Sequence, residues 1–282
     1  MYDVAIIGTG PAGLSAALNL KLHNKSILWL GSPALSRKVQ LSHAIANYPG
    51  LDTLSGAELN RKFTDQINSM DLEITDRLVT NILPDDSGFS LLGGNDFYQA
   101  KTILLAIGSA GPKALDGEEA LLGRGVSYCA TCDGFLYKGK TIAILCTDPQ
   151  YHHEVEYLAQ MAGKVYLHTP YKEGVPEAAN LERLSSPIRK IQGESKVESI
   201  LLGDGSQREV DGVFLLRNSV APATLLPGLE MDGPHIRTAR DLTTNIPGCF
   251  AAGDCTGRPY QIAKAVGDGN IAAHSILEYL GK

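Results

Sequence analysis

Two cysteines carry the most distinctive chemistry in this sequence of 282 residues. Cys129 and Cys132 form the C-x-x-C of "CATCDG", and thiols at this spacing can close a reversible disulfide. Such a pair tends to lower one thiol pKa, so that a thiolate nucleophile is present near neutral pH. Asp133 follows directly and could carry a proton to or from a leaving thiolate. The stretch therefore predicts dithiol–disulfide exchange.

The same two cysteines could instead be half of a zinc site, with His152 and His153 as further ligands. A second C-x-x-C is absent from the sequence, and adjacent histidines on a helix point about 100° apart. We therefore interpret the two histidines as part of a solvated helix face and expect no metal site. Cys146, Cys249 and Cys255 lie among apolar or small residues and are predicted to be core residues.

A glycine motif opens the chain. "GTGPAG" places Gly8, Gly10 and Gly13 in a G-x-G-x-x-G pattern between a strand-like and a helix-like run. Gly8 permits the tight turn, Gly10 lets the backbone approach a pyrophosphate, and Gly13 allows close contact between helix and strand. Pro11 suits the first helical position, and the helix N-terminus offers N–H groups to phosphates. The pattern predicts a dinucleotide site, although Ser32 stands where an acidic residue usually binds the ribose.

Two strand–helix–strand units must hold these motifs. The first comprises "YDVAIIG", the helix-like run after it and "KSILWL", and the second begins at Lys140 and continues through "KVYLH". Further elements are predicted as a helix over 55–68, strands within 72–99, a buried strand ending at 108, a helix over 150–161, strands within 188–216 and a helix over 260–280. Apolar strands that alternate with helices indicate parallel sheets.

The fold is therefore predicted as α/β, with two Rossmann-like three-layer domains and the second inserted in the first. The predicted boundaries are 1–109 and 244–282 for a discontinuous first domain, and 110–243 for the inserted one. A net charge of −6 argues against nucleic acid as a partner. No apolar run is long enough to cross a membrane, and no signal peptide precedes the first strand, so we expect no membrane association and a cytoplasmic location.

Six motifs, in order along nearly the whole chain, resemble the low-molecular-weight thioredoxin reductases. They are "IIGTGPAG", "NYPG", "LLAIG", "GRGVSYCATCDG", "TNIPGCFAAGDC" and "YQIAKAVGDG". The resemblance implies a homodimer that binds FAD in its first domain, with Asp254 on the ribityl chain and the helix after Tyr260 directed at the isoalloxazine. It also implies that Cys132 faces the flavin, that Cys129 attacks thioredoxin and that Asp133 acts as acid and base.

The site residues implied in this way form two groups. The catalytic group is Cys129, Cys132 and Asp133. The cofactor-binding group is Gly8, Gly10, Pro11, Ala12, Gly13, Ser32, Gln40, Asn47, Gly108, Gly253, Asp254, Gln261, Ile262 and Ala263.

The sequence departs from this family where NADPH would bind. The family has a second glycine cluster and a downstream His-Arg-Arg stretch, whereas this chain has "CTDP" at 146–149 and "HTPYKEG" from His168. Side chains would block close approach, Asp148 would repel phosphate, Pro149 lacks an N–H, and no guanidinium would hold the 2′-phosphate. We predict that the NADPH site is absent. A second departure, "SRKVQL", adds Arg37 and Lys38 where the family usually has glycines.

The pattern resembles the ferredoxin-dependent flavin thioredoxin reductases, in which reduced ferredoxin supplies electrons to FAD and the disulfide passes them to thioredoxin. Ferredoxins are acidic, so a basic docking patch is expected. Its candidates are Lys21, Lys25, Arg37 and Lys38, or Arg61 and Lys62. Alternatives are a diflavin-linked disulfide oxidoreductase with a second stacked FAD, an NADPH thioredoxin reductase with an atypical site, a non-catalytic flavin redox sensor, and a zinc-stapled binding module.

Overall fold

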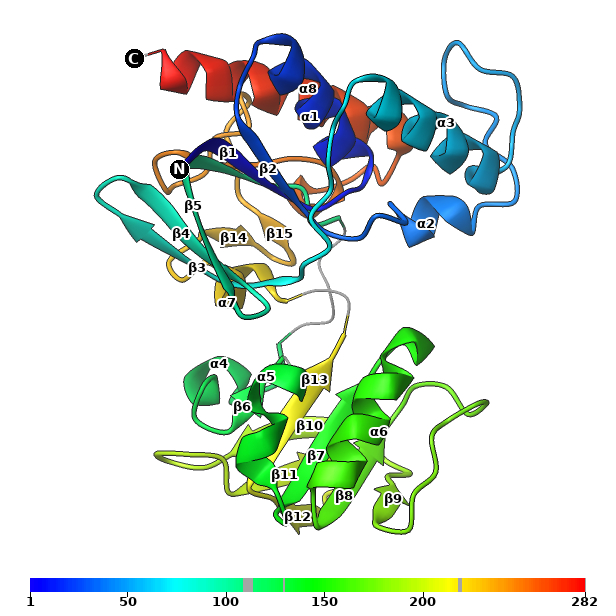
Figure 1. The fold of residues 1–282 in the computed structure, drawn as a ribbon, viewed down its shortest axis with the longest axis vertical. Coiled ribbons are helices and arrows are strands. Elements are labelled where there is room, and N and C mark those ends of the chain that lie inside the picture. The colour runs from blue at the N-terminus through cyan, green and yellow to red at the C-terminus, as the bar shows by residue number, and fades with distance from the viewer. Residues whose placement is uncertain (109–113, 129, 218–219, 282) are drawn as a thin grey trace. The chain divides into compact units, whose positions relative to one another are not determined.

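The computed structural model describes residues 1–108, 114–128, 130–217 and 220–281, except for the side chain of Cys132. The chain divides into two compact units, one made of Met1–Pro112 with Ala221–Lys282 and the other of Lys113–Val220 (Figure 1). The second unit is inserted in the first, as predicted from the sequence. No helix among the described residues is long and apolar enough to cross a membrane.

The first unit is built on a six-stranded sheet with the strand order β2-β1-β5-β4-β3, in which β16 also pairs with β5. The strands are β1 (Tyr2–Ile7), β2 (Ile27–Leu30), β3 (Val79–Asp85), β4 (Gly88–Gly93), β5 (Asp96–Leu105) and β16 (Cys249–Ala251). β1, β2 and β16 run parallel to their neighbours, whereas β3, β4 and β5 form antiparallel pairs. The parallel strands are apolar because both of their faces are covered.

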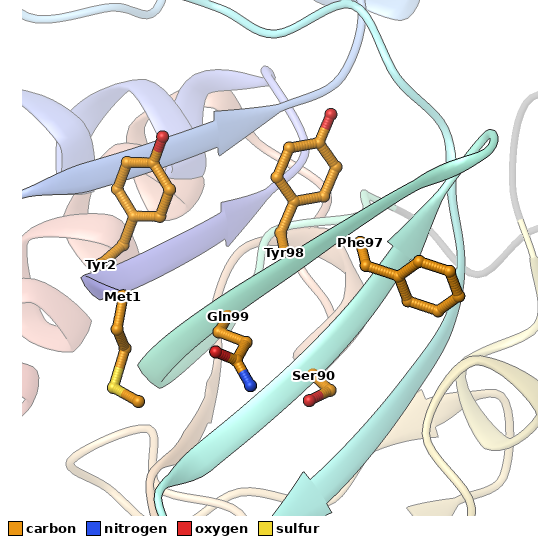
Figure 2. Close-up of a pocket in the computed structure, with 6 residues that line it drawn as sticks. All are labelled: Met1, Tyr2, Ser90, Phe97, Tyr98 and Gln99. Atoms are coloured by element: carbon orange, nitrogen blue, oxygen red, sulfur yellow. The ribbon is translucent and has the colours of Figure 1, made fainter.

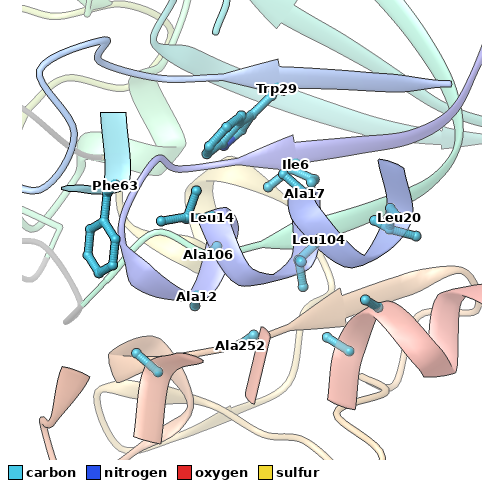
Figure 3. Packing of buried hydrophobic residues seen from close by; sticks show 14 of the residues in the cluster. Ile6, Ala12, Leu14, Ala17, Leu20, Trp29, Phe63, Leu104, Ala106 and Ala252 are labelled. Carbon is cyan, nitrogen blue, oxygen red and sulfur yellow. The ribbon is translucent and has the colours of Figure 1, made fainter. Parts of the chain in front are cut away.

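Helix α1 (Pro11–Leu22) packs between this sheet and α8 (Ile262–Leu280). Figure 3 shows Leu14, Ala17 and Leu20 of α1 close to Ile6 of β1 and Leu104 of β5. Small residues allow this packing, since a Cβ on Gly269 of α8 would lie 2.1 Å from the Ala12 carbonyl oxygen of α1. The layered arrangement fixes the C-terminal end of β1 against the N-terminal end of α1.

Shorter elements complete the first unit. They are α2 (Arg37–Gln40), α3 (Gly56–Ser69), α7 (Pro222–Leu225), β14 (Met231–Asp232), β15 (His235–Ile236) and η3 (Asp254–Thr256). α3 begins with a capping box, in which the Ser55 side chain accepts from the Glu58 N–H and the Glu58 carboxylate accepts from the Ser55 N–H. The helix predicted over 55–68 is thus confirmed to within one residue at each end.

The second unit contains a five-stranded parallel sheet with the order β6-β13-β7-β8-β9. Its strands are β6 (Val126–Ser127), β7 (Thr141–Cys146), β8 (Lys164–His168), β9 (Leu181–Arg183) and β13 (Gly212–Leu216). Its helices are α4 (Glu118–Leu121), α5 (Ala130–Asp133), η1 (Gly134–Tyr137), η2 (Pro149–Tyr151) and α6 (His152–Met161). A separate antiparallel sheet comprises β10 (Ile188–Gln192), β11 (Ser199–Leu202) and β12 (Gln207–Glu209). Parallel strand–helix–strand connections in both units confirm the predicted α/β class.

Two expectations about boundaries differ from the structure. The second crossing between units lies at Ala221 rather than at 244, because residues 221–243 pack on the first unit, with α7 against β3 and Leu242 in its core. The strand expected from Leu72 begins only at Val79, since the segment before it pairs with β2 through a single bridge between Thr75 and Leu30.

Candidate functional site

The glycine turn after β1 has two positions where sterics demand glycine and one where they do not. Gly8 has φ +112°, and a Cβ there would lie 2.2 Å from the Ala106 carbonyl oxygen. A Cβ on Gly13 would lie 2.1 Å from the Gly8 carbonyl oxygen. A Cβ on Gly10, in contrast, would meet no described atom within 4 Å. Gly8 and Gly13 therefore shape the turn, while Gly10 leaves open space above it.

The N-terminal end of α1 faces this open space with its positive pole uncovered. Gly10 is the N-cap and Pro11 follows, no described side chain caps the helix, and its first turn contains no acidic residue. Unpaired N–H groups at a helix N-terminus favour a bound anion. Gly8, Gly10, Pro11, Ala12 and Gly13 are thus placed as a pyrophosphate site requires.

A second uncovered helix end belongs to α8. No described side chain caps the N-terminus of this helix. The N-cap residue, Gln261, instead uses its side-chain oxygen to accept a hydrogen bond from Asn47 Nδ2 at 2.8 Å. Ile262 and Ala263 form the first turn, which also has no acidic residue. This end can stabilise negative charge on a ligand, and Asn47 orients the residue that enters the helix.

Gly253 connects these two helix ends. It has φ +89°, and a Cβ there would lie 2.9 Å from the Ala12 Cβ of α1. Its carbonyl oxygen accepts from Lys264 Nζ of α8 at 2.6 Å, and its N–H donates to Asp268 Oδ2 at 3.0 Å. The structure therefore brings the end of β16, the start of α1 and the first turns of α8 together, which fits FAD with its phosphates on α1.

Asp254 has a partner that the sequence did not indicate. Lys38 Nζ lies 2.7 Å from Asp254 Oδ2 and 4.9 Å above the centroid of the Tyr260 ring. The Asp254 side chain is only 14% exposed, so Lys38 balances a carboxylate that is mostly shielded from water. Lys38 thus contacts a candidate cofactor residue, and because its side chain is 61% exposed, its place in the expected docking patch stays a prediction. Lys21 of the same expected patch donates to the Asp71 carbonyl oxygen at 3.0 Å.

Three further predicted cofactor residues are Ser32, Gly108 and Gln40. Ser32 is exposed after β2, and its carbonyl oxygen accepts from Thr9 Oγ1 at 2.8 Å. Gly108 has φ +77° with no described atom within 4 Å of its Cβ position, and Gln40 is exposed at the end of α2. Thr9 lies inside the glycine motif, whose pattern does not specify this position. Its hydroxyl nevertheless links the loop after β2 to the turn after β1.

A surface hollow lies elsewhere on the first unit, away from the glycine turn (Figure 2). Met1 and Tyr2 line it at the start of β1, whereas the glycine turn follows the end of that strand. Its other lining residues are Ser90, Phe97, Tyr98 and Gln99. Cofactors of α/β sheets bind at the carboxyl ends of the parallel strands, so this hollow is not the candidate cofactor site.

The redox motif lies in the second unit between β6 and η1. Cys129 lies outside the described residues, and Cys132 is described only as part of the backbone of α5. Ala130, between them, is fully buried in the core of the second unit. Asp133 Oδ2 accepts a hydrogen bond from Ser127 Oγ at 2.6 Å. Ala130 and Asp133 of the motif are therefore held by the surrounding fold, and the contact of Asp133 with Ser127 could not be predicted from the sequence.

The turn after β7 is closed by side chains. Cys146 is fully buried, and its Sγ lies 3.3 Å from the Asp148 carbonyl oxygen and 3.2 Å from the Tyr171 hydroxyl. The same hydroxyl lies 2.9 Å from His152 Nε2. Burial raises the pKa of the Cys146 thiol, which leaves it protonated near neutral pH. Tyr171, from the stretch that replaces the expected arginines, thus packs against the residues that replace the glycines.

Asp148 also acts within the turn itself. Its carboxylate accepts from the Gln150 N–H at 3.0 Å and so caps η2, and the residue is 6% exposed. Pro149, the first residue of η2, has no N–H to offer. A phosphate at this turn would therefore meet a carboxylate and an occupied amide. At Gly10, in contrast, no described atom lies within 4 Å of the Cβ position.

The structure tests two further expectations about single residues. His153 is exposed as predicted, but His152 was wrongly assigned to a solvated face because it packs against Tyr171. Cys249 and Cys255 are buried as predicted, and burial raises the pKa of each thiol to about 12. Among the described residues, which exclude Cys129 and the Cys132 side chain, no three His, Cys, Asp or Glu side chains gather as metal ligands do.

The chain resembles known proteins over nearly its whole length. Residues 2–145 and 181–269 match the family described as pyridine nucleotide-disulphide oxidoreductase. A thioredoxin reductase from Treponema pallidum is 34% identical over 298 aligned residues, which cover 99% of this chain and 97% of that protein. One from Bacillus subtilis is 29% identical, with coverage of 99% and 95%.

Solved structures extend the resemblance to the whole backbone. A ferredoxin-flavin thioredoxin reductase from Clostridium acetobutylicum is 43% identical, with a TM-score of 0.91 over 99% of this chain and 97% of that chain. A thioredoxin reductase from Gloeobacter violaceus is 27% identical, with a TM-score of 0.80 over 99% of this chain and 94% of that one.

Proposed function

The chain belongs to the pyridine nucleotide-disulphide oxidoreductase family as a homologue of the thioredoxin reductases, and on that premise we propose that it reduces thioredoxin with electrons from reduced ferredoxin. FAD is the cofactor of this family and would carry the electrons to a Cys129–Cys132 disulfide. The likeness to the Clostridium acetobutylicum ferredoxin-flavin enzyme supports this choice of donor.

The closed turn after β7 is the observation that carries the proposal. A family member that uses a nicotinamide cofactor needs an open glycine turn there, because the backbone must approach the pyrophosphate. Cys146, Tyr171 and His152 fill this region with hydrogen-bonded side chains, and Asp148 adds a negative charge. The turn after β1 remains open at Gly10. One nucleotide site is retained and the other is lost, so electrons must enter by another route.

The chain's own residues would act in sequence. The first turns of α1 and α8 would hold the phosphates and the flavin ring of FAD, which would supply the conversion of single electrons into a two-electron transfer. Two electrons and two protons convert the Cys129–Cys132 disulfide into two thiols. Cys129 then attacks the thioredoxin disulfide, and Cys132 resolves the mixed disulfide. Asp133, oriented by Ser127, is placed next in the chain to Cys132 to exchange a proton with a thiolate.

A reconstituted assay tests this function. The flavin-loaded protein is mixed anaerobically with oxidised thioredoxin and photoreduced ferredoxin, and thioredoxin thiols are counted. We expect catalytic formation of two thiols per thioredoxin. Cys132→Ser should abolish it, because a single thiol cannot resolve a mixed disulfide. Cys249→Ser is the matched control, since it removes a buried thiol outside the redox motif.

The other proposed functions predict different results in the same assay. Turnover with NADPH at the ferredoxin rate would favour an atypical nicotinamide site. Two flavins per chain, with electrons moving from thiols to flavin, would favour the diflavin enzyme. A flavin that is reduced while thioredoxin stays oxidised would favour a redox sensor. A colourless protein with one zinc per chain would favour the binding module.

Two further properties complete the proposal. We expect a homodimer, which the family resemblance supports, and light scattering should give twice the mass of the chain. We also expect the protein to act in the cytoplasm, because its dithiol must be kept reduced to serve thioredoxin. Fractionation of cells that express the protein with a tag would test the location.

A further inference from the structure

A buried ion pair lies beside the redox motif in the second unit. Arg217 follows β13 and is 2% exposed, and Glu118 at the start of α4 is fully buried. Arg217 Nη2 contacts Glu118 Oε1. The two residues are 99 positions apart in the sequence. Charged residues are rarely buried to this extent unless they are paired, so each of the two side chains depends on the other for its place in the interior.

Glu118 connects this pair to two other segments. The Tyr128 hydroxyl donates to Glu118 Oε1, and the Leu115 N–H donates to Glu118 Oε2 at 2.8 Å. The Arg217 guanidinium also lies 5.5 Å from the centroid of the Tyr128 ring, within cation–π range. Burial, followed by the nearby Glu118 carboxylate, raises the pKa of Tyr128, so its hydroxyl remains a donor. Arg217 Nε and Nη1 have no hydrogen-bond partner in the described part of the chain.

The residues that contact Glu118 lie at three distinct points of the sequence. Tyr128 is the residue before Cys129. Leu115 comes shortly after residues 109–113, where the chain enters the second unit, and Arg217 comes just before residues 218–219, where it leaves. One carboxylate therefore ties Tyr128, just before the redox motif, to Leu115 and Arg217, which lie near the two ends of the second unit in the sequence.

Stability alone does not account for such a cluster. Buried ion pairs lose so much hydration that well-packed apolar residues of similar volume are often equally stabilising or better. What an ion pair with fixed hydrogen bonds does provide is a defined geometry. These hydrogen bonds fix the position of Tyr128, which directly precedes Cys129 in the sequence.

We propose that Arg217 is a positioning residue for the redox motif. It pairs with Glu118 in the interior, Glu118 holds the Tyr128 hydroxyl, and Tyr128 fixes the backbone that leads into the redox motif. These contacts should shift the thiol–disulfide equilibrium of the Cys129–Cys132 pair toward the disulfide. The proposal rests on the redox role of these cysteines under the proposed function, and it assigns to Arg217, Glu118 and Tyr128 a part that the sequence motifs do not.

The equilibrium constant between the cysteine pair and glutathione measures this effect directly, because neither the flavin nor a protein partner takes part in the exchange. Two glutathione molecules reduce one Cys129–Cys132 disulfide and become one glutathione disulfide, and alkylation followed by mass analysis gives the fraction oxidised. Arg217→Met and Tyr128→Phe should each lower the stability of the disulfide, measured as this equilibrium constant, by about tenfold. Arg217→Lys retains the charge and should recover part of the loss, whereas Arg189→Met, at an exposed position on β10, should change nothing.

Thermal unfolding of each variant shows whether it still folds, so that a changed equilibrium constant is not confused with unfolding. If Arg217→Met does not fold, the equilibrium constant of Tyr128→Phe tests the proposal by itself. The inference is overturned if the folded variants keep the equilibrium constant within about twofold of the parent. If the parent protein forms no Cys129–Cys132 disulfide at any glutathione ratio, the proposed function itself fails, and that result is distinct from the first.

Discussion

At the scale of single residues, the three glycines of the turn after β1 have different roles, because two are required by the fold and one is not. Gly8 and Gly13 are required by the fold, since a Cβ at either would lie within 2.2 Å of a carbonyl oxygen. Gly10 has φ −73°, which any residue adopts, and open space beside it. A ligand that approaches the backbone would account for glycine at that position.

Substitution of Gly10 tests this reading. Gly10→Val should lower the unfolding free energy of the cofactor-free protein by no more than about 1 kcal/mol, the cost of a poor N-cap on α1. It should weaken FAD binding roughly thirtyfold or more, because each lost hydrogen bond to a charged group is worth about 1.5–3 kcal/mol. Equilibrium dialysis of FAD measures the effect. Gly267→Ala, which adds a methyl group at an exposed position in α8, is the control. Unchanged FAD affinity in Gly10→Val would exclude the turn as the phosphate site.

Other residue contacts could not be predicted from the sequence. Lys38 and Asp254 are 216 positions apart, and Arg217 and Glu118 are 99 apart, so no local pattern links either pair. Nothing near Lys38 in the sequence marks Asp254 as its partner, so this contact emerges only from the fold. The glycine and C-x-x-C motifs were readable because their chemistry depends on short, fixed spacings.

At the scale of elements, local signals predicted those parts of the fold that depend on local physics. The strand–helix–strand runs around α1 and α6 followed from apolar run length and helical period, and α3 followed from Ser55 and Glu58 at its start. The boundary at 244 failed because α7, β14 and β15 are short and mostly lack their own periodic pattern. Their place on the first unit is set by tertiary contacts such as those of α7 with β3.

The parallel strands of the first unit share one ion pair at their amino ends. Asp3 in β1 accepts from Lys101 Nζ of β5 at 2.8 Å, and from the Ser26 N–H and hydroxyl before β2 at 3.0 and 2.9 Å. The Lys101 hydrogen bond, followed by those of Ser26, lowers the pKa of Asp3 to about 2. The carboxylate therefore stabilises the folded state above its ordinary pKa, and this contribution is lost as the pH falls toward 2.

Asp3→Asn should accordingly destabilise the protein in a pH-dependent way. At neutral pH we expect a loss of about 1 kcal/mol or less in unfolding free energy, since the pair lies near the surface. The difference from the parent should shrink as the pH is lowered from about 7 to about 3 in urea unfolding. Asp65→Asn, at an exposed position in α3, is the control. A difference that grows at low pH would contradict the assignment.

At the scale of the whole molecule, the two units hold different parts of one electron path. The first unit has the open turn at Gly10 and the uncovered ends of α1 and α8, and the second has the redox motif and the closed turn after β7. The sequence predicted the loss of the NADPH site from residue types alone. The hydrogen bonds of Tyr171 with Cys146 and His152 close the turn to which that prediction refers.

Anaerobic stopped-flow reduction of the flavin-loaded protein tests the central claim most directly. The loss of flavin absorbance is followed after mixing with NADPH, NADH or photoreduced ferredoxin at equal reducing equivalents. The account predicts rapid bleaching by ferredoxin and no bleaching by either nicotinamide on the same timescale. Rapid bleaching by micromolar NADPH would contradict it, because the closed turn after β7 would then admit a nucleotide.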